Sequence, residues 1–149
     1  MVWNPQVALA IFVGITATVE DLARREIPNW IPVAAVTGGL AAAAWTGGWS
    51  GFGSSLLGTV LGFLVFLVFY LLGGMGGGDV KLMAGIGAIL GAGRMLEASL
   101  WTAGLGGIFA VLALGWSALL RRGPKTTPAH IPYAPAITLG AWLSLVPKG

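Results

Sequence analysis

The sequence predicts an all-α protein, a polytopic transmembrane bundle of about six helices that forms one domain over residues 1–149. Hydrophobic residues make up 56% of the chain and charged residues only 9%, whereas about 25% of the residues in soluble domains are charged. The apolar residues fall into six runs, and no polar spacer divides the chain into separate domains. These observations favour an integral membrane protein over a soluble one.

The six apolar runs predict the helices in chain order. A membrane-spanning helix needs about 20 mostly apolar residues, with about 17 as the lower end of the range, so the second, fourth and sixth runs are short. For the fourth run, a full span and a re-entrant segment both stay open. The runs cover Pro5–Val19, Trp30–Trp45, Leu56–Leu72, Val80–Ala92, Ala98–Leu120 and Ile131–Val146.

The segments between these runs support the same division into helices. No basic residue precedes the first run, so we expect that run to remain in the protein rather than to be cleaved as a signal peptide. Pro28 interrupts the chain after the first run, and Asn29 is a residue type that caps the next helix. The uncharged stretch "WTGGWSGFGS" follows the second run and carries aromatic residues that suit a membrane interface. We expect this stretch to connect two helices.

Two glycine pairs predict a close contact between helices. Gly58 and Gly62 in the third run, and Gly87 and Gly91 in the fourth, have the GxxxG spacing. Residues four apart lie on one face of a helix, and the missing side chains allow a second helix backbone to approach closely. We expect these faces to pack against other helices.

The basic residues predict how the chain lies in the cytoplasmic (inner) membrane. Cytoplasmic connections carry more Lys and Arg than connections on the other side. Most of the basic residues follow odd-numbered runs, which places those connections in the cytoplasm and both termini outside. This side holds Arg24, Arg25, Lys81, Arg121, Arg122 and Lys125, whereas Arg94 and Lys148 lie on the other.

This orientation brings two acidic residues to one membrane face. Asp21 ends a helix that runs into the cytoplasm, and Asp79 begins a helix that runs out of it. Two carboxylates within a few ångströms of each other do not both ionise easily, so such a pair tends to share one proton. The ionised member can take a proton from an attacking water, and the protonated member can polarise a peptide carbonyl and then protonate the departing amine. Asp21 and Asp79 are therefore the predicted catalytic pair of an aspartic protease, with neither role assigned.

Structural roles for the same residues stay open. Asp21 lies among charged residues that can form ion pairs at a solvated helix end, and Glu20 is the alternative acid there. Asp79 can cap the helix that it begins. Lys81 and Arg25 are predicted to shape the site, but a cationic anchor at the membrane interface also accounts for each of them.

Three separated stretches resemble one protein family. "GGGD", Gly76 to Asp79, fits the GxGD signature of intramembrane aspartyl proteases, and Gly76 and Gly78 leave room for a bent backbone and a close substrate strand. "DLARREIPN", Asp21 to Asn29, resembles the acid, arginine and I-P-N stretch of bacterial prepilin peptidases, and "IPYAPAITLGAW", Ile131 to Trp142, resembles their last helix. The chain is therefore identified as similar to the type IV prepilin peptidases over nearly its whole length.

The resemblance implies a membrane endopeptidase that removes the basic leader from type IV prepilins at the cytoplasmic membrane face, just before the apolar helix of the pilin. It implies Asp21 and Asp79 as the catalytic pair. The chain lacks the cysteine-bearing insertion of the long bacterial form, and its length resembles the short branch associated with Tad or Flp-type pili. The N-methyltransferase activity of the longer relatives therefore stays open, and the archaeal preflagellin peptidases remain a close variant.

Composition limits the cofactors and partners. With no Cys and one His, the chain cannot build a disulfide framework or a Cys/His zinc cluster, and we expect neither a metal nor another cofactor. Membrane topology explains the net charge of +3 better than binding to nucleic acid does. The expected partners are a prepilin-like substrate, with a basic leader and an apolar helix, and membrane lipid. Self-association stays open.

Two other function classes stay open. A small proton-coupled transporter could use the same acids as a relay, with the glycine-rich break before Asp79 as a discontinuous helix. A relay needs acids along a path through the membrane, whereas Glu97 alone lies opposite the other acids. A noncatalytic assembly subunit could use its GxxxG faces to bind partner helices.

Overall fold

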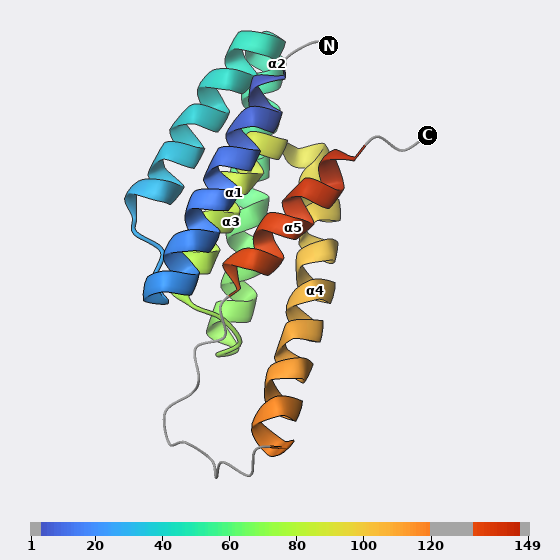
Figure 1. Cartoon of the computed structure of the whole chain (residues 1–149). Coiled ribbons are helices and arrows are strands. Elements are labelled where there is room, and N and C mark those ends of the chain that lie inside the picture. Colours follow the sequence, from blue (N-terminus) through green and yellow to red (C-terminus); the bar gives the residue numbers. More distant parts are fainter. Residues whose placement is uncertain (1–3, 120–132, 147–149) are drawn as a thin grey trace.

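The computed structural model describes residues 4–119 and 133–146, which form a bundle of helices (Figure 1). The predicted all-α class is therefore confirmed for these residues. Both chain ends and the predicted cytoplasmic stretch "RRGPKTTPAHIP" lie outside the described residues. In chain order, the described helices are α1, Pro5–Arg24; α2, Trp30–Leu71; α3, Gly77–Leu90; α4, Ala92–Leu119; and α5, Ala134–Leu145.

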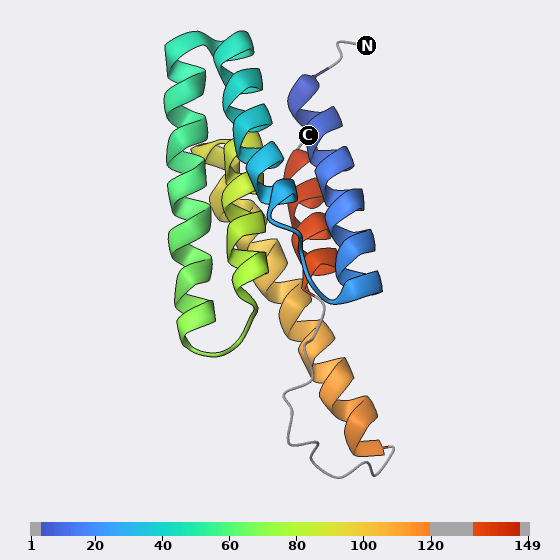
Figure 2. The ribbon, with the colours of Figure 1, turned by 90° about the vertical axis from the view of Figure 1, so that its left-hand side faces the viewer.

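Helix α2 contains the second and third predicted runs in one element of 42 residues. It is broken at Gly48, where φ is 58° and ψ is −144°, a conformation that glycine adopts at little cost. Residues 30–47 and 49–71 form two arms that run side by side in opposite directions (Figure 2). The expected count of about six helices is not confirmed for the described residues, which are assigned as five helices, because the second and third predicted runs join into one element that is broken only at Gly48.

Helix α3 lies between the two arms of α2 and is almost entirely buried. A Cβ atom added to Gly39, in the first arm, would lie 2.7 Å from the carbonyl carbon of Ala88, closer than side chains approach. A Cβ atom on Gly58, in the second arm, would collide with the carbonyl oxygen of Gly87. The close packing predicted from the glycine pairs is therefore confirmed, and it holds the start of α3 at a fixed place in the bundle.

Helix α5 packs against both α1 and α4. The Thr138 hydroxyl donates to the carbonyl oxygen of Gly14 at 3.1 Å, and the indole N–H of Trp142 donates to that of Ala10 at 3.2 Å. On the opposite face of α5, a side chain at Gly140 would collide with α4. These contacts fix the first turn of α5 beside the last turn of α1.

Three of the described helices are long and apolar enough to cross a membrane, namely α1, α2 and the Ala92–Leu112 part of α4. Helices α3 and α5 have 14 and 12 residues, fewer than the roughly 20 that a full span needs. Large apolar side chains are exposed on the bundle surface, among them Phe12 at 63% and Trp45 at 90%. Such a surface suits lipid better than water, as expected for a membrane protein.

Candidate active site

One hollow of about 320 Å³ gathers every residue that the sequence singles out as a site residue. We call it the acid pocket. It lies where the end of α1, the connection from α1 to α2, and the start of α3 meet. Its lining is Asp21, Arg25, Glu26, Ile27, Asn29, Gly76, Gly77, Gly78, Asp79 and Lys81.

Asp21 reaches the acid pocket from the last turn of α1 and is only 6% exposed. Its Oδ2 atom accepts a hydrogen bond from the backbone N–H of Ala134, at 3.0 Å. Ala134 begins α5, and the first N–H groups of a helix have no partner inside the helix and carry a partial positive charge. The start of α5 therefore orients the Asp21 carboxylate.

Asp79 reaches the acid pocket from the first turn of α3 and is 7% exposed. Its Oδ2 atom accepts the backbone N–H of Gly76 at 3.1 Å, and its own N–H donates to the carbonyl oxygen of Gly76 at 3.2 Å. The predicted capping role of Asp79 is therefore confirmed. The cap leaves the side chain in the wall of the pocket, so capping and a role in the site are compatible.

The two aspartates interact electrostatically. Asp79 lies in the first turn of α3, outside the three helices that are long enough to span a membrane. Burial, and then the nearby Asp21 carboxylate, raise the pKa of Asp79 well above its ordinary value, while the hydrogen bond from Gly76 acts in the opposite direction. The pair therefore holds a proton at a pH where an isolated aspartate has lost it.

The glycine-rich stretch allows two parts of the site to touch. Gly73 has a φ of 76°, in the left-handed region that favours glycine, and it turns the chain after α2. A Cβ atom on Gly78 would lie 3.3 Å from the Cβ atom of Ile27, tighter than ordinary van der Waals contact. The missing side chain at Gly78 thus lets the I-P-N stretch pack directly against the first turn of α3.

Two residues of the acid pocket are linked in a way that the sequence did not predict. Asn29 occupies the position before α2, but its side chain makes no capping hydrogen bond there, so the predicted cap is wrong. Instead, the Lys81 ammonium donates to the Asn29 side-chain oxygen at 3.0 Å. The bond ties the start of α2 to the start of α3. Because these two residues lie 52 positions apart in the sequence, only the folded structure shows that they are partners.

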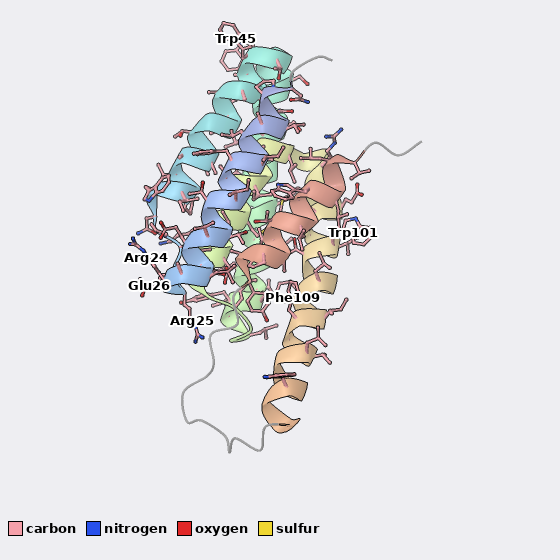
Figure 3. The ribbon with its side chains drawn as sticks, in the orientation of Figure 1. Arg24, Arg25, Glu26, Trp45, Trp101 and Phe109 are labelled. Carbon is pink, nitrogen blue, oxygen red and sulfur yellow. The ribbon has the colours of Figure 1, made fainter. Side chains whose placement is uncertain are left out.

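The charged residues at the end of α1 divide between the pocket and its surroundings. Glu20, the alternative acid, does not line the acid pocket and forms an ion pair with Arg24 at 3.1 Å. This confirms the ion pairing that the charge pattern predicted for the helix end. Arg25 lines the acid pocket and ends α1 in a left-handed conformation with a φ of 55°, its backbone N–H donating to the carbonyl oxygen of Asp21. Figure 3 shows Arg24, Arg25 and Glu26 together at this end of the bundle.

Known proteins resemble this chain over most of its length. The prepilin leader peptidase/N-methyltransferase of Bacillus subtilis (strain 168) is 33% identical over 140 residues, which cover 93% of this chain and 52% of the relative. Proteins of the same name from Aeromonas salmonicida (strain A449) and Aeromonas hydrophila are 30% and 32% identical over 152 residues, covering 97% of this chain and 50% of each relative. No solved structure matches the chain significantly.

The alignments cover most of this chain but only part of each relative. The chain spans about half the length of the curated relatives that it matches. The model of the type IV leader peptidase family matches residues 8–111, more than half of the chain, and this region contains both Asp21 and Asp79. The chain therefore belongs to the type IV leader peptidase family.

Proposed function

We propose that this chain is a membrane aspartic endopeptidase that cleaves the basic leader from prepilin-like precursors of the Flp or Tad type. One observation carries the proposal: two buried aspartates, Asp21 and Asp79, line one pocket in a member of the leader peptidase family. The prepilin is the substrate named for the relatives, and its leader is the part that a leader peptidase removes.

The proposed reaction needs one proton on the pair. The ionised carboxylate takes a proton from a water molecule while the water oxygen attacks the scissile carbonyl carbon. The protonated carboxyl group donates a hydrogen bond to the carbonyl oxygen, and a proton then passes to the departing amine as the C–N bond breaks. The products are the leader with a new carboxylate and the pilin with a new amino group. Neither aspartate forms a bond to the substrate.

Backbone groups support this division of work by holding one oxygen of each carboxylate. Asp21 is held by the N–H of Ala134, and Asp79 is held by the N–H of Gly76. In each carboxylate these bonds involve Oδ2. Each acid is thus held at a separate helix start, which fixes its position relative to the other. Such fixed positioning is what acid–base catalysis requires.

We further propose that the acid pocket faces the cytoplasm and that both chain termini lie outside. Arg24, Arg25 and Glu26 lie at the pocket end of the bundle, and the exposed Trp45 lies at the far end (Figure 3). Clustered basic residues are typical of the cytoplasmic side, and tryptophan is typical of a membrane interface. This orientation would let a leader in the cytoplasm reach both aspartates.

The proposal is tested by cleavage of a prepilin encoded beside the gene. Asp21→Asn and Asp79→Asn keep the size of each side chain but remove its acid and base chemistry. We expect each to lower the cleavage rate by about 100-fold or more, the usual contribution of a general acid or base. Glu20→Gln is the matched control, because Glu20 adjoins Asp21 in the chain but lies outside the acid pocket, and it should cut at the wild-type rate.

Full cleavage by either aspartate variant would refute the aspartate pair. The same variants also separate the proposal from proton-coupled transport. Transport in liposomes that depends on Asp21 and Asp79, with no prepilin cut, would favour a transporter. The structure does not favour that alternative, because Glu97 lies near the start of α4, beyond the opposite end of α3 from Asp79.

A further inference from the structure

A second hollow, of about 390 Å³, begins where the acid pocket ends. We call it the apolar groove. It lies between the two arms of α2, with α3 as its floor, and Figure 2 shows this side of the bundle. Apart from the two residues described next, its lining is Pro32, Val33, Val36, Thr37, Phe63 and Ala84.

Asn29 and Lys81 line both the acid pocket and the apolar groove. They form the boundary between the two, joined by the hydrogen bond from the Lys81 ammonium to the Asn29 side-chain oxygen at 3.0 Å. On one side of this bond the lining is charged and glycine-rich. On the other side it is almost entirely aliphatic and aromatic. A substrate chain that crosses this boundary would therefore pass directly from a polar lining to an apolar one.

The groove opens on the surface that faces lipid. Val33 is 61% exposed and Phe63 is 41% exposed, although both are large apolar residues. Val33 comes from the first arm of α2 and Phe63 from the second, so the groove is the gap that the α2 hairpin leaves in front of α3. An apolar segment can enter such a gap sideways from the bilayer without crossing the polar pocket.

We propose that the apolar groove binds the apolar segment of the substrate that follows the scissile bond, while the acid pocket holds the bond itself. This inference rests on the proposed peptidase function. A lipid chain would fit the groove alone, whereas a substrate whose polarity changes at the cut fits both hollows and their shared boundary. The groove then selects substrates by the apolar segment, and the acid pocket cuts them.

The test compares two substrates. One is a full precursor with its apolar helix, and the other is a short peptide that holds the leader and a few residues beyond the cut. We expect wild type to cut the full precursor with the higher kcat/KM. Val33→Trp puts a bulky side chain into the groove, and it should lower the ratio of the two kcat/KM values by about tenfold or more, equivalent to about 1.4 kcal/mol.

Val68→Trp is the matched control. Val68 is an α2 residue that is 56% exposed and lines neither hollow, so the ratio should stay at the wild-type value. A photo-crosslinking residue at position 33 should also attach to the apolar segment of the bound precursor, whereas the same residue at position 68 should not.

The outcomes separate this inference from the function on which it rests. If wild type cuts neither substrate, the peptidase proposal fails and the groove proposal fails with it. If wild type cuts both substrates equally well, or if Val33→Trp slows both by the same factor, the groove proposal is overturned while the peptidase stands. Crosslinks from position 33 to lipid alone would also overturn it.

Discussion

Backbone N–H groups hold one carboxylate oxygen of each aspartate. Asp21 accepts an N–H from the first residue of α5, and Asp79 accepts one from the residue before α3. Both donors belong to helix starts, where N–H groups lack a partner within the helix. Hydrogen bonds to a charged acceptor are stronger than those between neutral groups, so each bond can hold its carboxylate in place.

Residue types alone could not predict these donors. Every residue except proline carries a backbone N–H, so nothing in the sequence marks Ala134 as a partner of Asp21. The cap predicted at Asn29 was wrong for a related reason. Asparagine is a common capping residue, but the Asn29 side chain accepts a hydrogen bond from Lys81 instead. The sequence could predict that both acids lie at one end of the bundle. Two apolar runs separate them, so the chain crosses the bundle and returns before it reaches Asp79.

The setting of Asp79 predicts how stability depends on pH. Its pKa is higher in the folded chain than in the unfolded chain, because the folded side chain is buried and lies near Asp21. Between the two pKa values the folded state keeps a proton that the unfolded state has lost. The free energy of unfolding therefore falls as pH rises through this interval and stays lower above it. We expect the unfolding temperature in detergent to fall over the same interval.

The Asp79→Asn variant isolates this effect, because its side chain has no proton to lose. Its unfolding temperature should fall less than that of wild type as pH rises. Glu20→Gln serves as the control, since Glu20 lies outside the acid pocket, and it should keep the wild-type dependence. If the unfolding temperatures of wild type and Asp79→Asn fell equally as pH rises, the buried position of Asp79 near Asp21 could not be the cause.

At the scale of the elements, the α2 hairpin is the device that places α3. Its arms pack on α3 through glycines, so the backbones are in direct contact and leave α3 little freedom to slide. The sequence predicted the apolar runs and the glycine contacts, because both are local patterns. It did not predict that "WTGGWSGFGS" stays helical on both sides of Gly48, because glycine has a low helix propensity.

The glycine contact predicts a large effect of a small substitution. A Cβ atom at Gly58 would meet the backbone of α3 at Gly87, which cannot rotate away as a side chain could. We expect Gly58→Ala to lower the free energy of unfolding by about 1 to 3 kcal/mol, the usual cost of overpacking. Thermal unfolding in detergent measures this cost.

Gly53→Ala is the matched control for that experiment. Gly53 lies in the same arm of α2, but a Cβ atom there would meet nothing within 4 Å. Because alanine favours a helix more than glycine does, this variant should be as stable as wild type or up to about 1 kcal/mol more stable. Equal stability of Gly58→Ala and Gly53→Ala would show that the backbones of α2 and α3 are not in contact at Gly58.

At the scale of the whole molecule, polarity differs between the two ends of the bundle. The end that carries the acid pocket holds Arg24, Arg25 and Glu26, and the opposite end holds the break in α2, with Trp45 and Trp49 each 90% exposed. Such a difference orients a protein in a bilayer, because clustered basic residues favour the cytoplasmic side and tryptophan favours the headgroup interface. The orientation proposed for the active site follows from this asymmetry.

The chain has no cysteine, so its orientation can be tested with single-cysteine variants on an otherwise unchanged sequence. Glu26→Cys places a thiol beside the acid pocket, and Gly47→Cys places one at the opposite end, where a Cβ atom would meet nothing within 4 Å. In intact cells whose outer membrane has been made permeable, a charged maleimide that cannot cross the inner membrane should label Gly47→Cys only. Glu26→Cys should react only after the inner membrane is also opened, because its thiol would face the cytoplasm. The reverse pattern would place the acid pocket outside, where a cytoplasmic leader could not reach Asp21 and Asp79.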